Sequence, residues 1–414
     1  MMSGRDVQLL QNLVKIEFSE CTRCEQVPPL GHLPHLEVIK MYGLSNVKCI
    51  GPEFYGCHSV VNHDQCNDGI ITGSYSGAVT TATAEAMAVV FPALRELRLE
   101  DMPNIEEWCG LGVSSSSSNT TMFFPLLEFV HIRDCPELTT IPGHLLSLQE
   151  LIYGDILHTH RPHLRIRVSR GSKLKIGVLL VDLLEKSGTT LRKLTVSSLE
   201  ELCYLEKNLQ NLTSLEDLTI EECPNLKSII KEIEEKEEEE VSNCSGLTSL
   251  QRRRISSCKE LTCLPKGLLQ QTLVTLEIEW CPNLIIMVDP DELCSLPSLQ
   301  NLSIQGCQRL AGWWEERLFC LTSLQTLEIA LFSEELEYFP WPSTTVSVAS
   351  ASISASVSAT TEEEIDDDDT KYYHPNPKHY PFISLVSLTL YVWERLKYLL
   401  DQLQHLTTLR DLSF

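Results

Sequence analysis

The placement of cysteine is the feature of this sequence that most suggests chemistry. The chain contains 16 cysteines, and five of them follow a similar alternating apolar segment: Cys135, Cys223, Cys258, Cys281 and Cys307. Cysteine thiolates bind zinc and carry out redox chemistry. The C-x-x-C pair of Cys21 and Cys24 has no thioredoxin-like βαβ pattern around it, which argues against a redox motif there. These thiols therefore have two possible roles: metal or redox chemistry, and packing in the core.

The spacing of the cysteines favours packing. The segments 215–226, 273–284 and 299–310 share the pattern L-x-x-L-x-I-x-x-C-x-x-L, and Cys258, Cys281 and Cys307 are 23 and 26 residues apart. This period and pattern are typical of the leucine-rich repeat, in which Asn or Cys occupies the turn after a short strand. Cysteine suits that position because it is small and readily buried. We therefore predict that the five cysteines form a packing ladder, with Cys21 at the same position of the first repeat.

Other candidates for chemistry are weaker. His158, His160 and His163 have a spacing that could hold a metal, but no cysteine or carboxylate accompanies them at a set spacing, so an exposed loop is the favoured interpretation. The sequence has no G-x-x-x-x-G-K-[ST] phosphate-binding loop. The G-x-x-x-G at 73–77 misses the register of a G-x-S-x-G nucleophile elbow. We therefore expect a protein that is not an enzyme and that holds no metal or cofactor.

The repeat pattern extends over most of the chain. Counting the segments above, about a dozen units fit, and the others begin near Leu13, Leu36, Leu94, Leu127, Leu191, Leu250, Leu324, Leu385 and Leu409. Stacked units of this kind pair their strands in parallel. The predicted fold is an α/β repeat: a curved leucine-rich repeat solenoid with a parallel β-sheet on the concave face, an irregular or short-helical convex side, and several long disordered insertions.

The repeats divide the chain into segments. We expect leucine-rich repeats in 1–56, 91–145 and 189–340, with a serine-rich loop at 112–121 and an acidic loop at 231–246 inside the last two. Three insertions or irregular regions follow these repeats: an insertion loop at 57–90, a degenerate repeat region at 146–188, and a low-complexity acidic insertion at 341–380. Truncated terminal repeats are expected at 381–414.

Arg253 breaks the repeat pattern, because it stands where an inward-facing apolar residue is expected. Burying an unpaired guanidinium costs far more than the roughly 1.5–3 kcal/mol that a buried leucine contributes. We therefore predict that Arg253 turns outward or pairs with a carboxylate and that its repeat is weakened.

Composition restricts the classes of partner. The formal net charge is −24, and the acidic tracts 231–240 and 362–369 supply half of it. Such a surface disfavours non-specific nucleic-acid binding. Residues 161–175 form a basic island, which is either an anion or partner patch or a solvated face. No apolar run is long enough to span a membrane, and the first residues lack the features of a secretory signal. We expect a protein of the cytoplasm, with the nucleus as an alternative.

Strand alternation predicts the residues that line the concave face, where solenoids commonly bind protein partners. Exposed aromatic and charged side chains there suit protein recognition better than a small-molecule pocket. The candidate positions begin with Lys15 and Glu17 and continue with Lys40, Tyr42, Glu96, Arg98, Glu100, Phe129, His131, Arg133, Asp217, Thr219, Glu221, Glu277, Glu279, Ser303, Gln305, Thr389 and Tyr391.

Residues 27–56, VPPLGHLPHLEVIKMYGLSNVKCIGPEFYG, resemble a phrase from the leucine-rich repeat region of plant intracellular nucleotide-binding immune receptors of the coiled-coil class. The segment 91–108 and the C-P-x-L repeats resemble the units that follow it in that family. The resemblance implies recognition of a pathogen effector or a guarded host protein, together with autoinhibition through the receptor's own nucleotide-binding domain. That domain is not recognisable in this sequence, so the resemblance does not imply ATP hydrolysis. The alternatives are a leucine-rich repeat substrate adaptor or scaffold outside immunity, and a non-functional truncated paralogue.

Overall fold

The computed structural model describes fifteen stretches of the chain: 10–56, 89–109, 122–142, 145–154, 184, 189–200, 202–205, 209, 211–229, 247–264, 271–285, 296–313, 321–331, 382–392 and 406–414. The serine-rich loop 112–121, the basic island 161–175, the three histidines of 158–163, the acidic loop 231–246 and the insertion 341–380 lie outside these residues, as does nearly all of the insertion 57–90.

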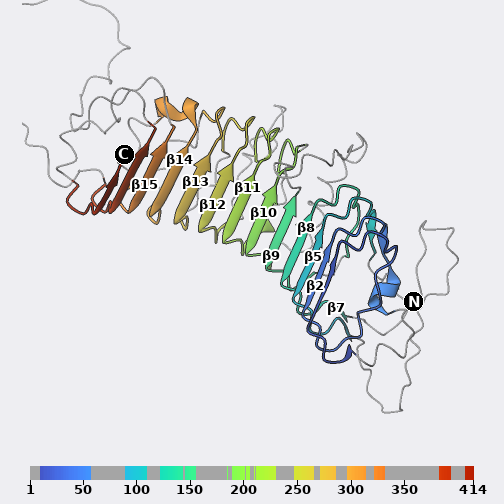
Figure 1. The fold of residues 1–414 in the computed structure, drawn as a ribbon. Coiled ribbons are helices and arrows are strands. Elements are labelled where there is room, and N and C mark those ends of the chain that lie inside the picture. The colour runs from blue at the N-terminus through green and yellow to red at the C-terminus, as the bar shows by residue number, and fades with distance from the viewer. Residues whose placement is uncertain are drawn as a thin grey trace, which may run out of the picture.

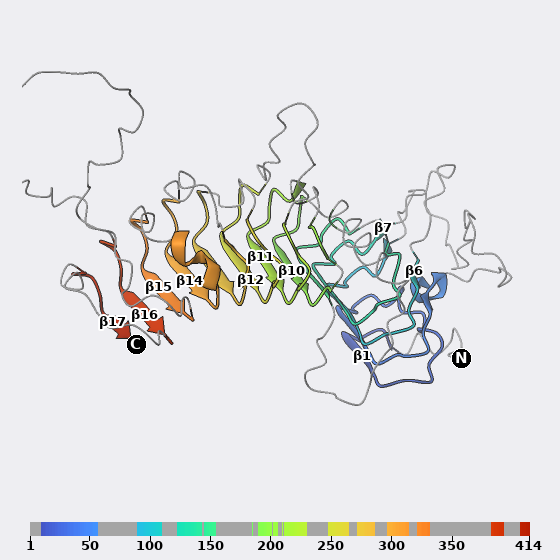
Figure 2. The same cartoon turned by 90° about the horizontal axis from the view of Figure 1, so that it is seen from above.

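One parallel sheet of thirteen strands runs through the molecule, and each strand pairs with the strand of the next repeat (Figure 1). Seen from above, the repeats follow an arc and the sheet lines its inner side (Figure 2). The fold class predicted from the repeats is thereby confirmed. The strands are β1 (Lys15–Ser19), β2 (Val38–Tyr42), β5 (Glu96–Glu100), β8 (Phe129–Arg133), β9 (Glu150–Gly154), β10 (Lys193–Ser197), β11 (Asp217–Glu221), β12 (Arg252–Ser256), β13 (Thr275–Glu279), β14 (Asn301–Gln305), β15 (Thr326–Ala330), β16 (Ser387–Tyr391) and β17 (Asp411–Ser413).

The alternation of side chains along each strand separates the core from the inner face. The second and fourth residues, such as Leu276 and Ile278 of β13, are fully buried, whereas the first, third and fifth point to the other side of the sheet. Pairing in register stacks these residues on their counterparts in the neighbouring repeats. Each buried leucine contributes roughly 1.5–3 kcal/mol, so stability comes from contacts between adjacent repeats. At the two ends the burial is incomplete: Leu412 of β17 is 43% exposed.

The turn after each strand has a common construction. A residue with positive φ follows the strand, for example Glu222, Ser257 and Trp280, and the ladder position comes next. The five ladder cysteines are buried, and each thiol donates to the carbonyl oxygen two residues earlier at 3.3–3.4 Å. Cys21 makes the same bond at 3.5 Å. The packing role predicted for these cysteines is confirmed.

Short elements cover the flank and the outer side of the first repeats. They are β3 (Cys49–Ile50) with β6 (Glu107–Trp108), β4 (Val89–Val90) with β7 (Met122–Phe123), and the 3₁₀ helix η2 (Pro52–Tyr55); a second 3₁₀ helix, η4 (Gln308–Trp313), lies further along. Aromatic rings fill the space between them. Phe91 and Phe124 stack with centroids 5.1 Å apart, and Trp108 Nε1 donates to the Tyr55 hydroxyl at 3.1 Å. The EFYG motif of residues 53–56 therefore anchors the outer layer.

Two features differ from what the sequence pattern indicates. In the region 146–188, which is predicted to be degenerate, residues 150–154 form β9, which pairs in register with β8 and β10. Tyr153 is buried at the position where the pattern has Ile or Leu, so the strand is regular although its sequence departs from the consensus. Of the two alternatives predicted for Arg253, an outward turn or a pairing with a carboxylate, the outward turn is wrong. Arg253 is fully buried, paired in register with Leu218 and Leu276, because the hydrogen-bonded register of β12 leaves its side chain no outward direction.

Candidate functional site: the inner face of the sheet

The inner face carries three rows of side chains, contributed by the first, third and fifth residue of each strand. All the candidate residues lie in these rows. The first row holds Lys15, Glu96, Phe129 and Asp217; the third holds Glu17, Lys40, Arg98, His131, Thr219, Glu277, Ser303 and Thr389; the fifth holds Tyr42, Glu100, Arg133, Glu221, Glu279, Gln305 and Tyr391. Most of them are half-buried by their neighbours.

A linked group of charges occupies the inner face at β2, β5 and β8. Lys40 lies 3.4 Å from the Glu96 carboxylate, and Arg98 donates to the same carboxylate. The Arg98 guanidinium also lies 4.9 Å from the centre of the Phe129 ring, in a cation–π contact. Although partial burial raises the pKa of Glu96, the two cations outweigh it and hold the pKa below its ordinary value. Neighbouring strands therefore position these side chains for one another.

His131 lies within this group but is neutral at pH 7. It is 6% exposed, and burial, with repulsion from Arg133 and Arg98, lowers its pKa to about 4. His131 Nδ1 is 3.2 Å from Glu100, but the geometry is not that of a hydrogen bond. The contact is therefore no ion pair at neutral pH.

Arg254 is the centre of a second group, on β11, β12 and β13. Its guanidinium nitrogens lie 3.4 Å from Glu221, 3.5 Å from Glu277 and 3.3 Å from Glu279. One cation therefore serves three carboxylates, and the group keeps a net negative charge. Further along the face, Gln305 donates to Glu328 at 2.9 Å, which extends the acidic character to β15.

Two interacting groups bring several of the candidate residues together, and Lys15 and Glu17 form a separate ion pair of 3.0 Å on β1. The first group joins Lys40, Glu96 and Arg98 to Phe129, and the second joins Glu221, Glu277 and Glu279 through Arg254. Thr389 and Tyr391 lie on β16, near the C-terminal end of the sheet, and are not brought next to either group. Tyr391 is 45% exposed.

Comparison with known proteins supports the resemblance seen in the repeats. A family model described as R13L1/DRL21 LRRs, where LRR means leucine-rich repeat, matches residues 2–44. An Arabidopsis thaliana protein named as an RPP13-like disease resistance protein is 28% identical over 260 residues, which cover 61% of this chain and 19% of that relative. The Arabidopsis protein SUPPRESSOR OF npr1-1, CONSTITUTIVE 1 is 32% identical over 140 residues, covering 31% of this chain and 9% of its own length. The chain is therefore similar to the leucine-rich repeat regions of plant disease resistance proteins.

Solved structures match this chain at low identity and with low TM-scores. The leucine-rich repeat domain of the type III effector XopL is 16% identical with a TM-score of 0.30, covering 75% of this chain and 65% of its own. An internalin of Listeria monocytogenes is 13% identical with a TM-score of 0.39, and the match covers 99% of this chain and 88% of the internalin chain.

None of the helices in the described residues combines the length and the apolar character that crossing a membrane requires.

Several inner-face residues of the repeat region escaped the sequence analysis. Arg254 and Glu328 occupy third positions, and Glu150 and Lys193 form an ion pair of 3.4 Å between the first positions of β9 and β10. Applying the same alternation to 252–256, 326–330 and 150–154 would have found them. Arg254 follows Arg253, where the apolar pattern of its strand is broken, and Glu150 belongs to a strand whose sequence departs from the consensus.

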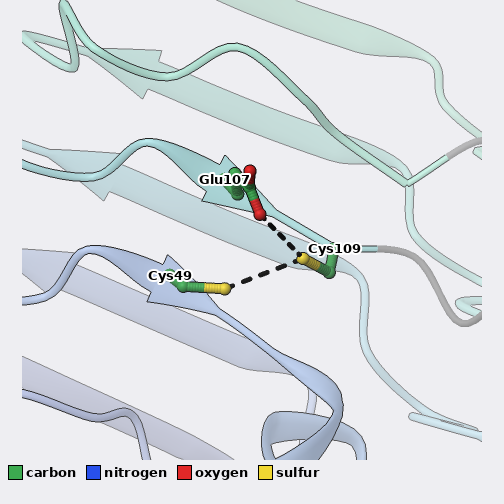
Figure 3. A group of neighbouring side chains, drawn as sticks. All are labelled: Cys49, Glu107 and Cys109. Atoms are coloured by element: carbon green, nitrogen blue, oxygen red, sulfur yellow. Dashed lines mark hydrogen bonds between the residues drawn. The ribbon is translucent and has the colours of Figure 1, made fainter. Parts of the chain in front are cut away.

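One group of potential metal ligands lies off the inner face, on the flank. Cys49 and Cys109 have their Sγ atoms 3.7 Å apart, and Cys109 Sγ lies 3.6 Å from Glu107 Oε2 (Figure 3). Neither cysteine is in a disulfide. The hydrogen bond with Cys49, together with burial, raises the pKa of the Cys109 thiol. No sequence motif joins these residues, because Cys49 and Cys109 are 60 positions apart.

Proposed function

We propose that this repeat region is the recognition module of a plant immune receptor and that its inner face binds a protein: a pathogen effector or a guarded host protein. In the resting receptor the same region contacts the nucleotide-binding domain and contributes to autoinhibition. The module works by binding and not by catalysis, in the cytoplasm or, as an alternative, in the nucleus. The similarity to disease resistance proteins supports this role. Because the chain covers 19% of the length of the RPP13-like relative, signalling is assigned to other parts of such a receptor.

The observation that carries the proposal is the distribution of charge on the inner face. Around Arg254, three carboxylates share one guanidinium, and Glu328 adds a fourth carboxylate two strands further on. The face at β11–β15 is therefore acidic and complements a partner that presents lysine or arginine side chains. At β2–β8, Phe129 lies among Arg98, Glu96 and Lys40, a combination of aromatic and charged groups that is common at protein–protein hot spots.

The test is a pairwise interaction screen of the whole chain against pathogen effectors and host proteins. Any binder is then measured by titration calorimetry with the double variant Glu277→Lys, Glu279→Lys. Two like charges placed opposite a cationic partner are expected to weaken binding by about 100-fold or more. The matched control is Glu260→Lys, which reverses an exposed charge outside the sheet. An equal loss of affinity in the double variant and in Glu260→Lys would contradict binding through this face, and so would an unchanged affinity in the double variant.

A further inference from the structure

We propose that Cys49, Glu107 and Cys109 form a binding site for a thiophilic divalent cation, with zinc the ion that fits best. The three side chains come from two neighbouring repeats and offer two sulfur ligands and one carboxylate oxygen. Zinc binds this combination of ligands, whereas magnesium and calcium prefer oxygen alone. The site is separate from the inner face and from the cysteine ladder, whose thiols point into the core.

The backbone brings the three ligands to one side. In the β3–β6 pair, Cys49 is opposite Glu107 and Ile50 is opposite Trp108. Ile50 and Trp108 are buried, so alternation turns Cys49, Glu107 and Cys109 outward together. Figure 3 shows the three side chains converging from the two strands.

Backbone hydrogen bonds hold this arrangement. Cys109 N donates to the Ile50 carbonyl at 2.9 Å, which fixes the second cysteine beside the first strand. On the other side of β6, Trp108 N donates to the Thr140 carbonyl at 3.0 Å. Beneath the strands, the buried indole of Trp108 donates to the Tyr55 hydroxyl. A site supported in this way requires little reorganisation to accept an ion.

Two of the three distances between the ligand atoms match a tetrahedral zinc centre, and all three ligand atoms lie within 4.8 Å of one another. With zinc–sulfur bonds of about 2.3 Å, two sulfurs at the tetrahedral angle are about 3.8 Å apart. The Sγ atoms of Cys49 and Cys109 are 3.7 Å apart. A zinc–oxygen bond of about 2.1 Å places sulfur and oxygen about 3.6 Å apart, which is the separation of Cys109 Sγ and Glu107 Oε2. A disulfide would need the two sulfurs at about 2.05 Å.

Access and proton balance agree with metal binding. Cys49 is exposed, while Glu107 and Cys109 are half-buried, so an ion reaches the ligands from solvent. Each zinc ion that binds displaces the protons of the two thiols, which leave to water, and the thiolates and the carboxylate then supply three ligands. The fourth tetrahedral position is open to water or to a side chain of a partner. The bound ion would link the second and third repeats on the flank.

The experiment measures zinc binding to the whole reduced chain by calorimetry and by the thiolate-to-metal absorption of Co²⁺. Cys49→Ser, Cys109→Ser and Glu107→Gln are compared with the controls Cys203→Ser and Cys263→Ser, which change cysteines outside the site. We expect the controls to bind as the unmodified chain does, and each site variant to bind about tenfold or more weakly. Zinc is expected to raise the Tm of the unmodified chain and of the controls by more than it raises that of Cys109→Ser.

Two results would overturn the proposal. The first is zinc affinity that is the same in the site variants and the controls. The second is a reduced chain that does not bind zinc, whether or not oxidation then yields a Cys49–Cys109 disulfide in peptide mass mapping. Glu107→Gln keeps both thiols and alters an outward-facing side chain, so it tests the site even if a cysteine variant folds poorly. Because the readout is metal binding on the flank, its failure would leave the proposed role of the inner face intact.

Discussion

Arg254 Nη1 lies 3.5 Å from Oε2 of Glu277, and Glu221 and Glu279 approach the same guanidinium from the two sides. Each of these pairs is partly exposed and by itself worth little, about 0–1 kcal/mol. Removing the cation, however, would leave three carboxylates facing one another across adjacent strands. Arg254 therefore stabilises the fold mainly by cancelling the repulsion among these three carboxylates.

Replacing Arg254 with Gln should lower the free energy of unfolding by about 1 kcal/mol, because the three carboxylates then repel one another. Salt screens such repulsion, so the loss should shrink at high ionic strength. Urea denaturation at low and high salt measures both effects. Arg252→Gln is the control, since Arg252 is 64% exposed and pairs with Asp217 alone among the described residues. Losses of equal size and equal salt dependence in the two variants would contradict this role.

His131 should make the stability depend on pH. Its pKa is about 4 in the folded chain and about 6.5 when unfolded, so between these values the unfolded chain binds more protons. Stability therefore falls as the pH drops through this window and is retained above it. The variant His131→Asn removes the titration and should flatten the profile between pH 4 and pH 6.5.

The measurement for His131 is the free energy of unfolding across that range, together with an NMR titration of the imidazole. Glu96, Glu100, Arg98 and Arg133 remain in both proteins, so their contributions cancel to first order in the comparison. His35→Asn changes an exposed histidine and serves as the control. An NMR pKa near 6.5 for His131 would show that the imidazole is solvated, contrary to the structure.

The repeat pattern predicts the sheet well because the same physical requirement recurs in every unit. Leu273, Leu276 and Ile278 are apolar since each faces a core formed with the neighbouring repeats, and that requirement is visible in one sequence. Strand β9 was missed because Tyr153 satisfies the same burial with a different side chain. The outward turn predicted for Arg253 is wrong because a paired strand keeps its register even where burying one side chain is costly.

The clusters of interacting side chains were harder to predict, because their members come from different repeats. The partners of Arg254 come from two other strands, and which carboxylates reach it follows from the pairing register. The approach of Cys109 to Cys49 depends on a two-stranded sheet too short to leave a periodic pattern. Sequence alternation can place a residue on a face, but contacts across repeats require the register.

The ladder thiols should react with alkylating reagents only when the chain unfolds. Burial raises the pKa of Cys223 to about 12, so at pH 8 about one molecule in ten thousand carries the thiolate. The hydrogen bond with Cys281, together with burial, raises the pKa of Cys258 as well. Iodoacetamide labelling with peptide mapping should modify exposed Cys203 first and the two ladder cysteines only in denaturant. Labelling of Cys223 or Cys258 at the rate of Cys203 in the native chain would contradict the buried ladder.

Replacing Arg253 with Leu should stabilise the chain. Arg253 stacks between Leu218 and Leu276 in the buried row, and the apolar replacement avoids the desolvation of a guanidinium. The expected gain in the free energy of unfolding is about 1 kcal/mol, at the low end of the range found when whole buried ion pairs are replaced by apolar side chains, because the group that the guanidinium contacts stays in place. Denaturant unfolding measures it, with Leu276→Ala as a control that should lose about 2–5 kcal/mol. If Arg253→Leu lowers the stability, the interactions of the guanidinium inside the core outweigh its desolvation, and the repeat holding Arg253 is not a weakened one.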